Sequence, residues 1–272
     1  MSNAALAQSL IRAVNEAASA ASLLEAVQQL AAAQLEETIP TLIATLSYNN
    51  PGAAVAAVDG LVAIGKPAVQ PLLDLLDSHN YTARAWAIRA LAGIGDSRGL
   101  DELLDAAQND FALSVRRAAA RGLGTLHWYE LASDRVQAAQ VAALTALLKV
   151  CQDPEWVVRY AAITGLQALA SAASTLQPNL VLDIQHHLKQ FAETETDLTV
   201  RTRICWAQQQ LRAPSTSSPS LVYATDIGIG LELDWQRTVD NLYQRKFEER
   251  SHTLPEGDPR RYKKLVEVLQ TH

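Results

Sequence analysis

The chain has 272 residues, of which 49% are hydrophobic and 19% are charged, so it can bury a continuous core. The formal net charge of −6 and the pI near 5.5 argue against nucleic-acid binding, which needs a basic face. Two cysteines are too few for a disulfide framework. The N-terminal sequence lacks the pattern of a secretory signal, and no stretch approaches the roughly 20 apolar residues of a membrane span. We therefore expect a cytoplasmic protein.

A phrase typical of an Ala-rich helix recurs along the chain, and most copies carry an Arg near their start. The copies lie at residues 53–61, 83–91, 115–123, 158–166 and 200–206, so they begin 30, 32, 43 and 42 residues apart. Repetition at this period, with a second apolar helix between copies, predicts stacked helical hairpins. The predicted fold is all-α: an α-solenoid of HEAT-like helical-hairpin repeats with a C-terminal extension.

Polar residues, Gly and Pro mark the expected helix boundaries. Asn50 and Asp153, each followed by Pro, are predicted N-caps with Pro at the first helical position. Partner helices are predicted over residues 68–76 and 100–107, which place Leu at helical spacing on one face. Breaks between helices are expected at residues 65–67, 78–80 and 95–96.

The predicted organisation has a solenoid, a linker and a tail, at residues 1–212, 213–221 and 222–272. The linker is rich in Pro and Ser, which is typical of a flexible connection. In the tail, Trp235, Val239 and Leu242 would share one helical face, because Val239 and Leu242 follow Trp235 by four and seven residues. We therefore treat the tail as a helical extension and a candidate partner-docking segment.

The recurrent Arg of the phrase is expected to have a structural role. Near a helix start, its side chain can reach an acidic group or a loop carbonyl in the adjacent repeat. Ligand binding is the alternative. The residues concerned are Arg84, Arg116, Arg159 and Arg201.

The longer step between the third and fourth copies includes an insertion at residues 126–131, which carries His127, Trp128 and Tyr129. Insertions in repeat arrays often cluster on the binding face. This loop is therefore a candidate part of a functional site.

The usual catalytic motifs are missing from the sequence. There is no Gly-rich phosphate loop, no His-Glu-x-x-His and no Gly-x-Ser-x-Gly. The adjacent His186 and His187 would point about 100° apart on a helix, so they cannot chelate one metal together, and we predict no metal site. Cys205 is expected to be buried in an apolar helix, and Cys151 to be the more exposed thiol.

The repeats are similar to a known family. Residues 50–58, 81–94, 111–124 and 153–162 resemble the F-type subunit of the heterodimeric phycobilin lyases of cyanobacteria, and the resemblance covers about residues 1–212. It implies an enzyme subunit that is active only with an E-type partner. It also implies phycocyanobilin as substrate, attached through a thioether to a cysteine of the phycocyanin α subunit, and no tightly bound cofactor.

The resemblance also bears on a second activity. Some F-type relatives isomerise the bilin and carry an adjacent His-Cys pair in the loop after the third repeat's helix. Here His127 is followed by Trp128, so the His is kept and the Cys is missing. Isomerisation requires a thiolate that adds and leaves again. We therefore expect ligation without isomerisation, with a lyase-isomerase of the phycoerythrocyanin type as the alternative.

The implied chemistry requires a surface that holds the bilin and a group that handles protons. His127 is the candidate for proton handling. Trp128 and Tyr129 would either stack on the tetrapyrrole or pack the loop down. Arg117 and Arg121 share a helical face and could bind the two propionates, unless that face is merely solvated. Further candidates for contact with the bilin, for which core packing is the alternative, are Tyr81, Trp86, Trp156 and Tyr160.

Two functions from other classes stay open at this point. A bilin or phycobiliprotein chaperone would present the substrate while its partner does the chemistry. A purely structural adaptor is a common role of helical solenoids.

Overall fold

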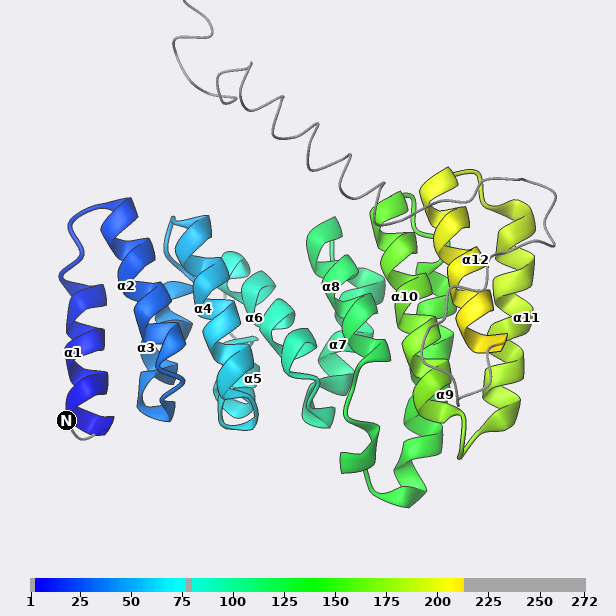
Figure 1. Ribbon diagram of the computed structural model, residues 1–272, viewed down its shortest axis with the longest axis horizontal. Coiled ribbons are helices and arrows are strands. Elements are labelled where there is room, and N and C mark those ends of the chain that lie inside the picture. The colour runs from blue at the N-terminus through cyan, green and yellow to red at the C-terminus, as the bar shows by residue number, and fades with distance from the viewer. Residues whose placement is uncertain (1–2, 77–79, 213–272) are drawn as a thin grey trace, which may run out of the picture. The chain divides into compact units, whose positions relative to one another are not determined.

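The computed structural model of the protein describes residues 3–76 and 80–212. In these residues it contains twelve α-helices, four short 3-10 helices and no strand, which confirms the predicted all-α solenoid (Figure 1). The predictions for residues 78–79, for the linker at 213–221 and for the tail at 222–272 lie outside the described residues.

The helices form two layers that follow chain order (Figure 1). The first layer holds the recurrent phrase and consists of α2 (Ala20–Ala32), α4 (Pro51–Ile64), α6 (Tyr81–Ile94), α8 (Leu113–Gly124), α10 (Trp156–Ala173) and α12 (Leu198–Arg212). The second consists of α1 (Asn3–Asn15), α3 (Ile39–Thr45), α5 (Val69–Leu76), α7 (Leu100–Asn109), α9 (Ser133–Val150) and α11 (Pro178–Thr194). The 3-10 helices are η1 (Glu36–Thr38), η2 (Lys66–Ala68), η3 (Ser97–Gly99) and η4 (Trp128–Glu130).

The first layer is tightly packed because small residues recur at one position of the phrase. A Cβ built on Gly60 would lie 2.7 Å from the Cβ of Ala31 in α2, and one built on Gly122 would lie 2.6 Å from that of Ala92 in α6. At the equivalent Gly165, a Cβ would collide with the α8 backbone. Neighbouring helices of this layer therefore pack backbone against backbone, which explains the abundance of Ala and Gly.

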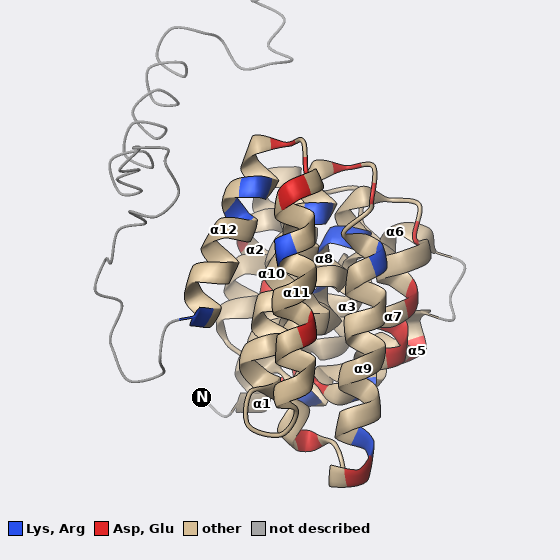
Figure 2. Cartoon of the chain, turned by 90° about the vertical axis from the view of Figure 1, so that its right-hand side faces the viewer, with Lys and Arg blue, Asp and Glu red and all other residues tan. Residues whose placement is uncertain are grey.

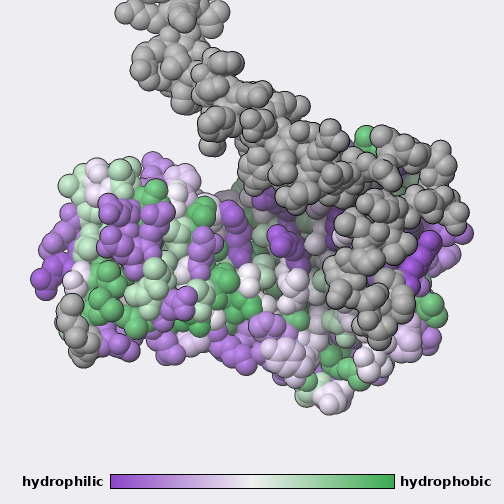
Figure 3. Space-filling model, viewed as in Figure 1, coloured by the Kyte–Doolittle hydropathy of each residue, from purple (hydrophilic) through white to green (hydrophobic). Residues whose placement is uncertain are grey.

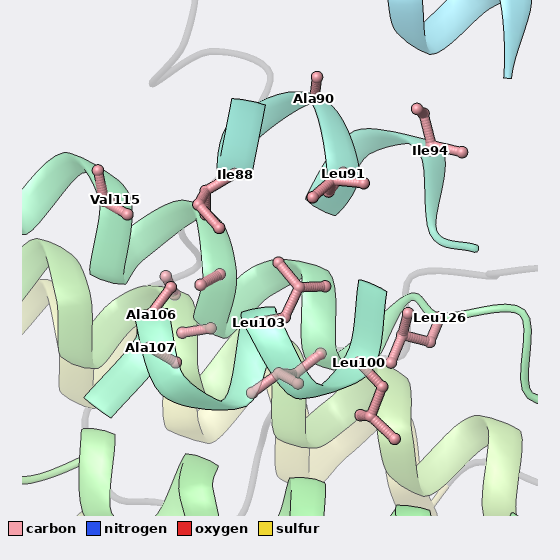
Figure 4. Packing of buried hydrophobic residues seen from close by; sticks show 14 of the residues in the cluster. Ile88, Ala90, Leu91, Ile94, Leu100, Leu103, Ala106, Ala107, Val115 and Leu126 are labelled. Carbon is pink, nitrogen blue, oxygen red and sulfur yellow. The ribbon is translucent and has the colours of Figure 1, made fainter. Parts of the chain in front are cut away.

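The core runs continuously between the two layers. Figure 4 shows how side chains from α6, α7 and α8 meet, with Leu126 of the following loop among them. Because each repeat shares this core with its neighbours, the stability of a repeat depends on the repeats beside it. The largest fully buried side chains are Leu30, Leu42, Leu46, Leu61, Leu72, Ile88, Leu91, Leu103, Leu123, Leu147, Ile163 and Leu166.

The predicted helix starts are confirmed in one case and wrong in the other. Asn50 caps α4, with its side chain accepting a hydrogen bond from the Ala53 amide and with Pro at the first helical position. Asp153 is not a cap, because α10 begins at Trp156. The Asp153 carboxylate instead accepts a hydrogen bond from the Glu155 amide and forms an ion pair with an arginine of the preceding repeat.

That ion pair comes from Arg116, one of the recurrent arginines. Its Nε and Nη2 donate to the two Asp153 carboxylate oxygens at 2.6 and 3.1 Å, and its Nη1 donates to the carbonyls of Asp110 and Phe111. The Asp153 carboxylate raises the pKa of Arg116 by its hydrogen bond and its charge. The arginine therefore ties its own helix start to the loop of the next repeat, as predicted.

Arg159 repeats this arrangement one step later. Its Nε and Nη2 each donate at 2.8 Å to the Glu195 carboxylate, and its Nη1 donates to the carbonyls of Asp153 and Pro154. The guanidinium of Arg159 holds the pKa of Glu195 below its ordinary value of 4.5. The prediction of a structural role is thus confirmed for this arginine too.

The other two recurrent arginines differ from the prediction. The acidic residue within reach of Arg84 would be Asp110, but Asp110 accepts a hydrogen bond from the Tyr81 hydroxyl at 3.0 Å. The Arg84 Nε is buried without a hydrogen-bond acceptor. Arg201 lies in α12, the last described helix, where its exposed side chain forms no such bond within the described repeats.

No single helix in the described ranges 3–76 and 80–212 is long and apolar enough to cross a membrane. One pair of consecutive segments, Pro51–Ile64 and Lys66–Leu76, reaches the required length and hydrophobicity together but is bent by 117°.

Candidate functional site

The inserted loop is fixed to the turn that follows α6. It leaves α8 after Gly124, forms η4 and enters α9, and its Leu126 and Trp128 are buried. The His127 amide donates to the Gly95 carbonyl at 2.7 Å. Gly95 has φ 73°, and a Cβ there would lie 3.0 Å from the Thr125 carbonyl oxygen and 3.4 Å from His127 Nε2. Glycine is therefore required both for this backbone conformation and for the close approach of the loop.

Charged groups surround the His127 ring. His127 Nδ1 lies 3.3 Å from Glu130 Oε1, and Lys66 Nζ from η2 lies 2.9 Å from the same oxygen. The Glu130 carboxylate raises the pKa of Lys66. The ring of Tyr129 stacks on that of His127 with centroids 5.5 Å apart. The His127 side chain is 40% exposed, although its Nδ1 atom is buried without a hydrogen-bond partner.

The two aromatic residues of the loop have different roles. Trp128 is only 6% exposed and belongs to the core, so of its two predicted roles the packing role is confirmed. Tyr129 is 81% exposed and is available for stacking on a ligand.

A second candidate surface is the outward face of the first layer. Residues at two equivalent positions of the recurrent phrase form two rows across α4, α6, α8, α10 and α12, and none of these residues is buried. One row contains Asp59, Arg89, Arg121, Thr164 and Trp206. The other contains Val55, Ala85, Arg117, Tyr160 and Thr202. On the side seen in Figure 3, hydrophilic and hydrophobic side chains alternate over α4, α6 and α8.

The arginines of this surface contact aromatic rings. The Arg89 guanidinium lies 4.4 Å from the centroid of the Trp86 ring. Arg203 lies 5.9 Å from the centroid of Tyr160, and its Nε donates at 3.1 Å to the Thr164 hydroxyl across α10 and α12. We call Trp86, Arg89, Tyr160 and Arg203, together with Arg117 and Arg121, the basic face.

Within the part of the chain that the structure describes, no carboxylate forms an ion pair with an arginine of the basic face. Partial burial lowers the pKa of Arg89, and the charge of Arg117 lowers it further, against the opposing effect of Asp59. Burial also lowers the pKa of Arg203, whose Nη1 has no hydrogen-bond acceptor. Figure 2 shows the acidic residues of α5 and α7 on a different side of the molecule, away from α12. Although the chain is acidic overall, this face can attract an anion.

The structure thus separates the predicted site residues into three groups. His127, Trp128 and Tyr129 lie in the loop after α8. Trp86, Arg117, Arg121 and Tyr160 lie on the basic face, and Trp156 stands at the start of α10. Tyr81 lies at the start of α6, where its ring stacks on Phe111 with centroids 4.2 Å apart. Burial and the Asp110 carboxylate raise the pKa of Tyr81 to about 12.

Core packing was the alternative role for four aromatic residues, and three of them lie outside the core, although Tyr81 packs against the next repeat through Phe111 and Asp110. Tyr81, Trp156 and Tyr160 are 37%, 44% and 38% exposed. Only Trp86 is partly buried against the core. The Ala-rich helices supply enough small apolar residues to fill the interior, so the aromatic rings stay outside.

Sequence reasoning missed Arg89, Arg203, Lys66 and Glu130. Arg89 carried a signal, because it occupies the same phrase position as Arg121. Lys66 and Glu130 are far apart in the sequence, so no sequence signal pointed to their contact.

Both predictions for the thiols are wrong. Cys151 is 7% exposed, and burial raises its pKa, whereas Cys205 is exposed on α12. Cys205 faces away from the core because Val200, Ile204 and Ala207 form the buried side of that helix. Within the described ranges, no group of three or more His, Cys, Asp or Glu residues could hold a metal ion.

Comparison with known proteins defines the family. HEAT repeats match residues 7–92 and 69–167. The phycocyanobilin lyase subunit beta of Pseudanabaena tenuis is 51% identical over 270 residues, which cover 96% of each chain. The chain belongs to the phycocyanobilin lyase beta-subunit family.

Other members of this family agree in sequence and in structure. The phycocyanin alpha phycocyanobilin lyase CpcF of Synechocystis sp. is 50% identical over 202 residues, or 74% of this chain and 92% of that protein. A solved complex of CpcE and CpcF of phycocyanin lyase from Nostoc sp. matches with a TM-score of 0.57 and 50% identity, over 63% of this chain and 98% of the matched one. The family resemblance predicted from the repeats is therefore confirmed.

Proposed function

We propose that this chain is the beta, or F-type, subunit of a heterodimeric lyase that attaches phycocyanobilin to a cysteine of the phycocyanin α subunit. The observation that carries the proposal is the 51% identity with a phycocyanobilin lyase subunit beta over 96% of both chains. A partner subunit of the E type follows from the relative whose structure is a complex of CpcE and CpcF.

The reaction is an addition and needs no oxidant or leaving group. The cysteine sulfur bonds to the ethylidene carbon of ring A, the π electrons of that double bond move into the ring, and the proton lost by the thiol is returned to the bilin. The protein has to orient the bilin, exclude water and move that proton. His127 suits the last task, because its ring is partly exposed and sits beside Glu130 and Lys66.

We further propose that the chain does not isomerise the bilin. An isomerase of this kind needs a thiolate next to the reacting ring. Neither cysteine lies in the inserted loop, and burial keeps Cys151 protonated by raising its pKa. We also place the protein in the cytoplasm, where two free thiols stay reduced.

Co-expression tests the proposal. This chain, an E-type subunit and the phycocyanin α subunit are produced in a bacterium that makes phycocyanobilin, and covalent bilin on the α subunit is detected by zinc-enhanced fluorescence on a denaturing gel. We expect covalent phycocyanobilin only when both lyase subunits are present. A product without this chain would refute the subunit assignment, and a violobilin spectrum would refute the absence of isomerase activity.

The role of His127 is tested in the same system. We expect His127→Ala to bind bilin and partner normally while covalent product falls at least about 100-fold, the typical contribution of general acid-base catalysis. His186→Ala, an exposed His on α11, is the matched control and should ligate normally. Normal ligation by His127→Ala would instead favour a chaperone that presents bilin to a catalytic partner.

A further inference from the structure

The basic face contains two arginines that belong to neighbouring helices. Arg89 on α6 and Arg117 on α8 lie on adjacent members of the first layer, whose axes are about 8–10 Å apart when small residues pack between them. Their charges are close enough that Arg117 lowers the pKa of Arg89. Arg121 follows Arg117 by one helical turn, so a third guanidinium stands on the same side of α8.

These cations lack carboxylate partners within the described residues. The ion pairs there connect Lys66 with Glu130, Arg98 with Asp96, Arg116 with Asp153 and Arg159 with Glu195. The repeats thus contain two kinds of arginine. One kind, including Arg116, is paired with a carboxylate inside the array, whereas Arg89 and Arg117 have no ion-pair partner there, and the Asp59 carboxylate acts on Arg89 only from beyond ion-pair distance. Unpaired like charges that lie close together favour binding of an anion with more than one negative group.

The surface beside these cations consists of small apolar side chains. Ala85 and Ala92 on α6 and Ala118 on α8 are partly exposed, and Trp86 is held beneath the Arg89 guanidinium. Because these side chains are small, α6 and α8 pack closely and present a shallow surface on which a flat conjugated molecule can lie. The face therefore combines an apolar floor with adjacent cations, which suits a planar dicarboxylate.

We propose that Arg89 and Arg117 bind the two propionate groups of the linear tetrapyrrole, which lie on adjacent rings, while the rings rest on the α6 and α8 surface beside Trp86. This inference rests on the proposed function for the identity of the ligand. It assigns the main role to Arg89, which the sequence did not single out, and leaves Arg121 as a neighbouring cation.

An acidic protein surface is the other anion that this face could attract, and the geometry favours the tetrapyrrole. A protein partner gains most from exposed aromatic anchors. At Arg89 the aromatic ring of the basic face is that of Trp86, which is partly buried and already covered by the Arg89 guanidinium, whereas the exposed ring of Tyr160 belongs to α10.

Esterification of the ligand tests the proposal directly. The full chain, copurified with an E-type subunit, is titrated with phycocyanobilin and with its dimethyl ester, which keeps the rings and removes both negative charges. We expect the free acid to bind about tenfold more tightly than the ester, because charge-assisted hydrogen bonds contribute at that level. The Arg89→Gln/Arg117→Gln variant should bind the acid as weakly as the ester and bind the ester like the wild type.

The matched control is Arg12→Gln/Arg135→Gln, two exposed arginines on α1 and α9, which should keep the full preference for the acid. Equal binding of acid and ester by the wild type would overturn the proposal without any variant, even if the Arg89→Gln/Arg117→Gln chain failed to fold. The proposal would also be overturned if the Arg89→Gln/Arg117→Gln variant lost the E-type partner but bound bilin unchanged, and that result would assign the face to that partner.

The outcomes separate this site from the proposed function. Covalent ligation by the wild type without any preference for the acid would refute the propionate site and leave the lyase assignment intact. A preference for the acid that the arginine substitutions abolish, in a complex that never ligates, would support the site and refute the lyase assignment.

Discussion

At the scale of single residues, a recurrent arginine links two repeats only if it has a carboxylate within reach. Arg116 and Arg159 occupy the same phrase position and find Asp153 and Glu195 in the next repeat. Arg84 occupies that position too, but the Tyr81 hydroxyl bonds to the equivalent carboxylate, that of Asp110. The sequence predicts the position of the arginine, whereas its partner depends on the geometry of a loop about 37 residues further along.

We expect Arg159→Gln to lower the free energy of unfolding by about 2–3 kcal/mol, because it removes two charge-assisted hydrogen bonds from a mostly buried pair. Chemical denaturation at neutral pH measures the effect. Arg84→Gln is the comparison, and it should cost less because no carboxylate is lost. Equal losses for the two variants would show that the carboxylate pairing adds nothing.

The same ion pair predicts a pH dependence. Arg159 lowers the pKa of Glu195 in the folded state below its ordinary value of 4.5, so the pair stabilises the fold fully above that value. The stabilisation is lost as pH falls through the lowered, folded-state pKa. We therefore expect the stability difference between wild type and Glu195→Gln to shrink as the pH falls below 4.5. Urea denaturation across the acid range checks this, and a constant difference would contradict it.

At the scale of elements, packing of the first layer requires small residues at defined positions. We expect Gly165→Ala to destabilise the fold by roughly 1–3 kcal/mol, because the new Cβ would collide with the α8 backbone at Ala120. Gly52→Ala is the control, since a Cβ there meets Leu24 and Asn50 at ordinary distances of 3.4–3.5 Å. Thermal unfolding of both variants measures the difference. Similar melting temperatures would show that α8 and α10 can separate without cost.

Helix existence and order could be predicted, but the exposure of single side chains could not. The repeated phrase identified the helices because its period and its Gly and Pro boundaries are local features. The helices of the first layer are apolar on several sides, so the pattern did not reveal that Tyr160 and Trp156 point outward. Cys205 was placed wrongly because the prediction assumed a buried helix, whereas α12 is the last one described.

The candidate site was predictable only in part, for a similar reason. His127 stood out because an insertion broke the repeat spacing. Arg89 and Arg203 belong to the regular pattern, and only the stacking of helices shows that they share a face with Arg117. Lys66 in η2 reaches Glu130 in η4, two repeats further along the chain, and no spacing in the sequence predicts that contact.

At the scale of the whole molecule, the lengths of relatives bear on the tail. The Synechocystis protein aligns over 92% of its own length but only 74% of this chain. The CpcF-containing structure likewise covers 98% of the matched chain and 63% of this one. Although the tail is a candidate docking segment and the Pseudanabaena tenuis relative aligns over 96% of this chain, the shorter relatives lead us to expect that a chain truncated after Arg212 still forms the heterodimer and ligates phycocyanobilin at a rate similar to the full chain. Loss of partner binding on truncation, measured by copurification, would instead assign docking to the residues beyond 212.

The central claim is that this chain completes an enzyme that adds one bilin to one protein thiol. The most direct test is the intact mass of the phycocyanin α subunit after incubation with phycocyanobilin, this chain and an E-type subunit. We predict an increase by the full mass of one phycocyanobilin, with nothing lost, and no such product when this chain is omitted. An unchanged mass in the complete mixture, or the same product without this chain, would contradict the account.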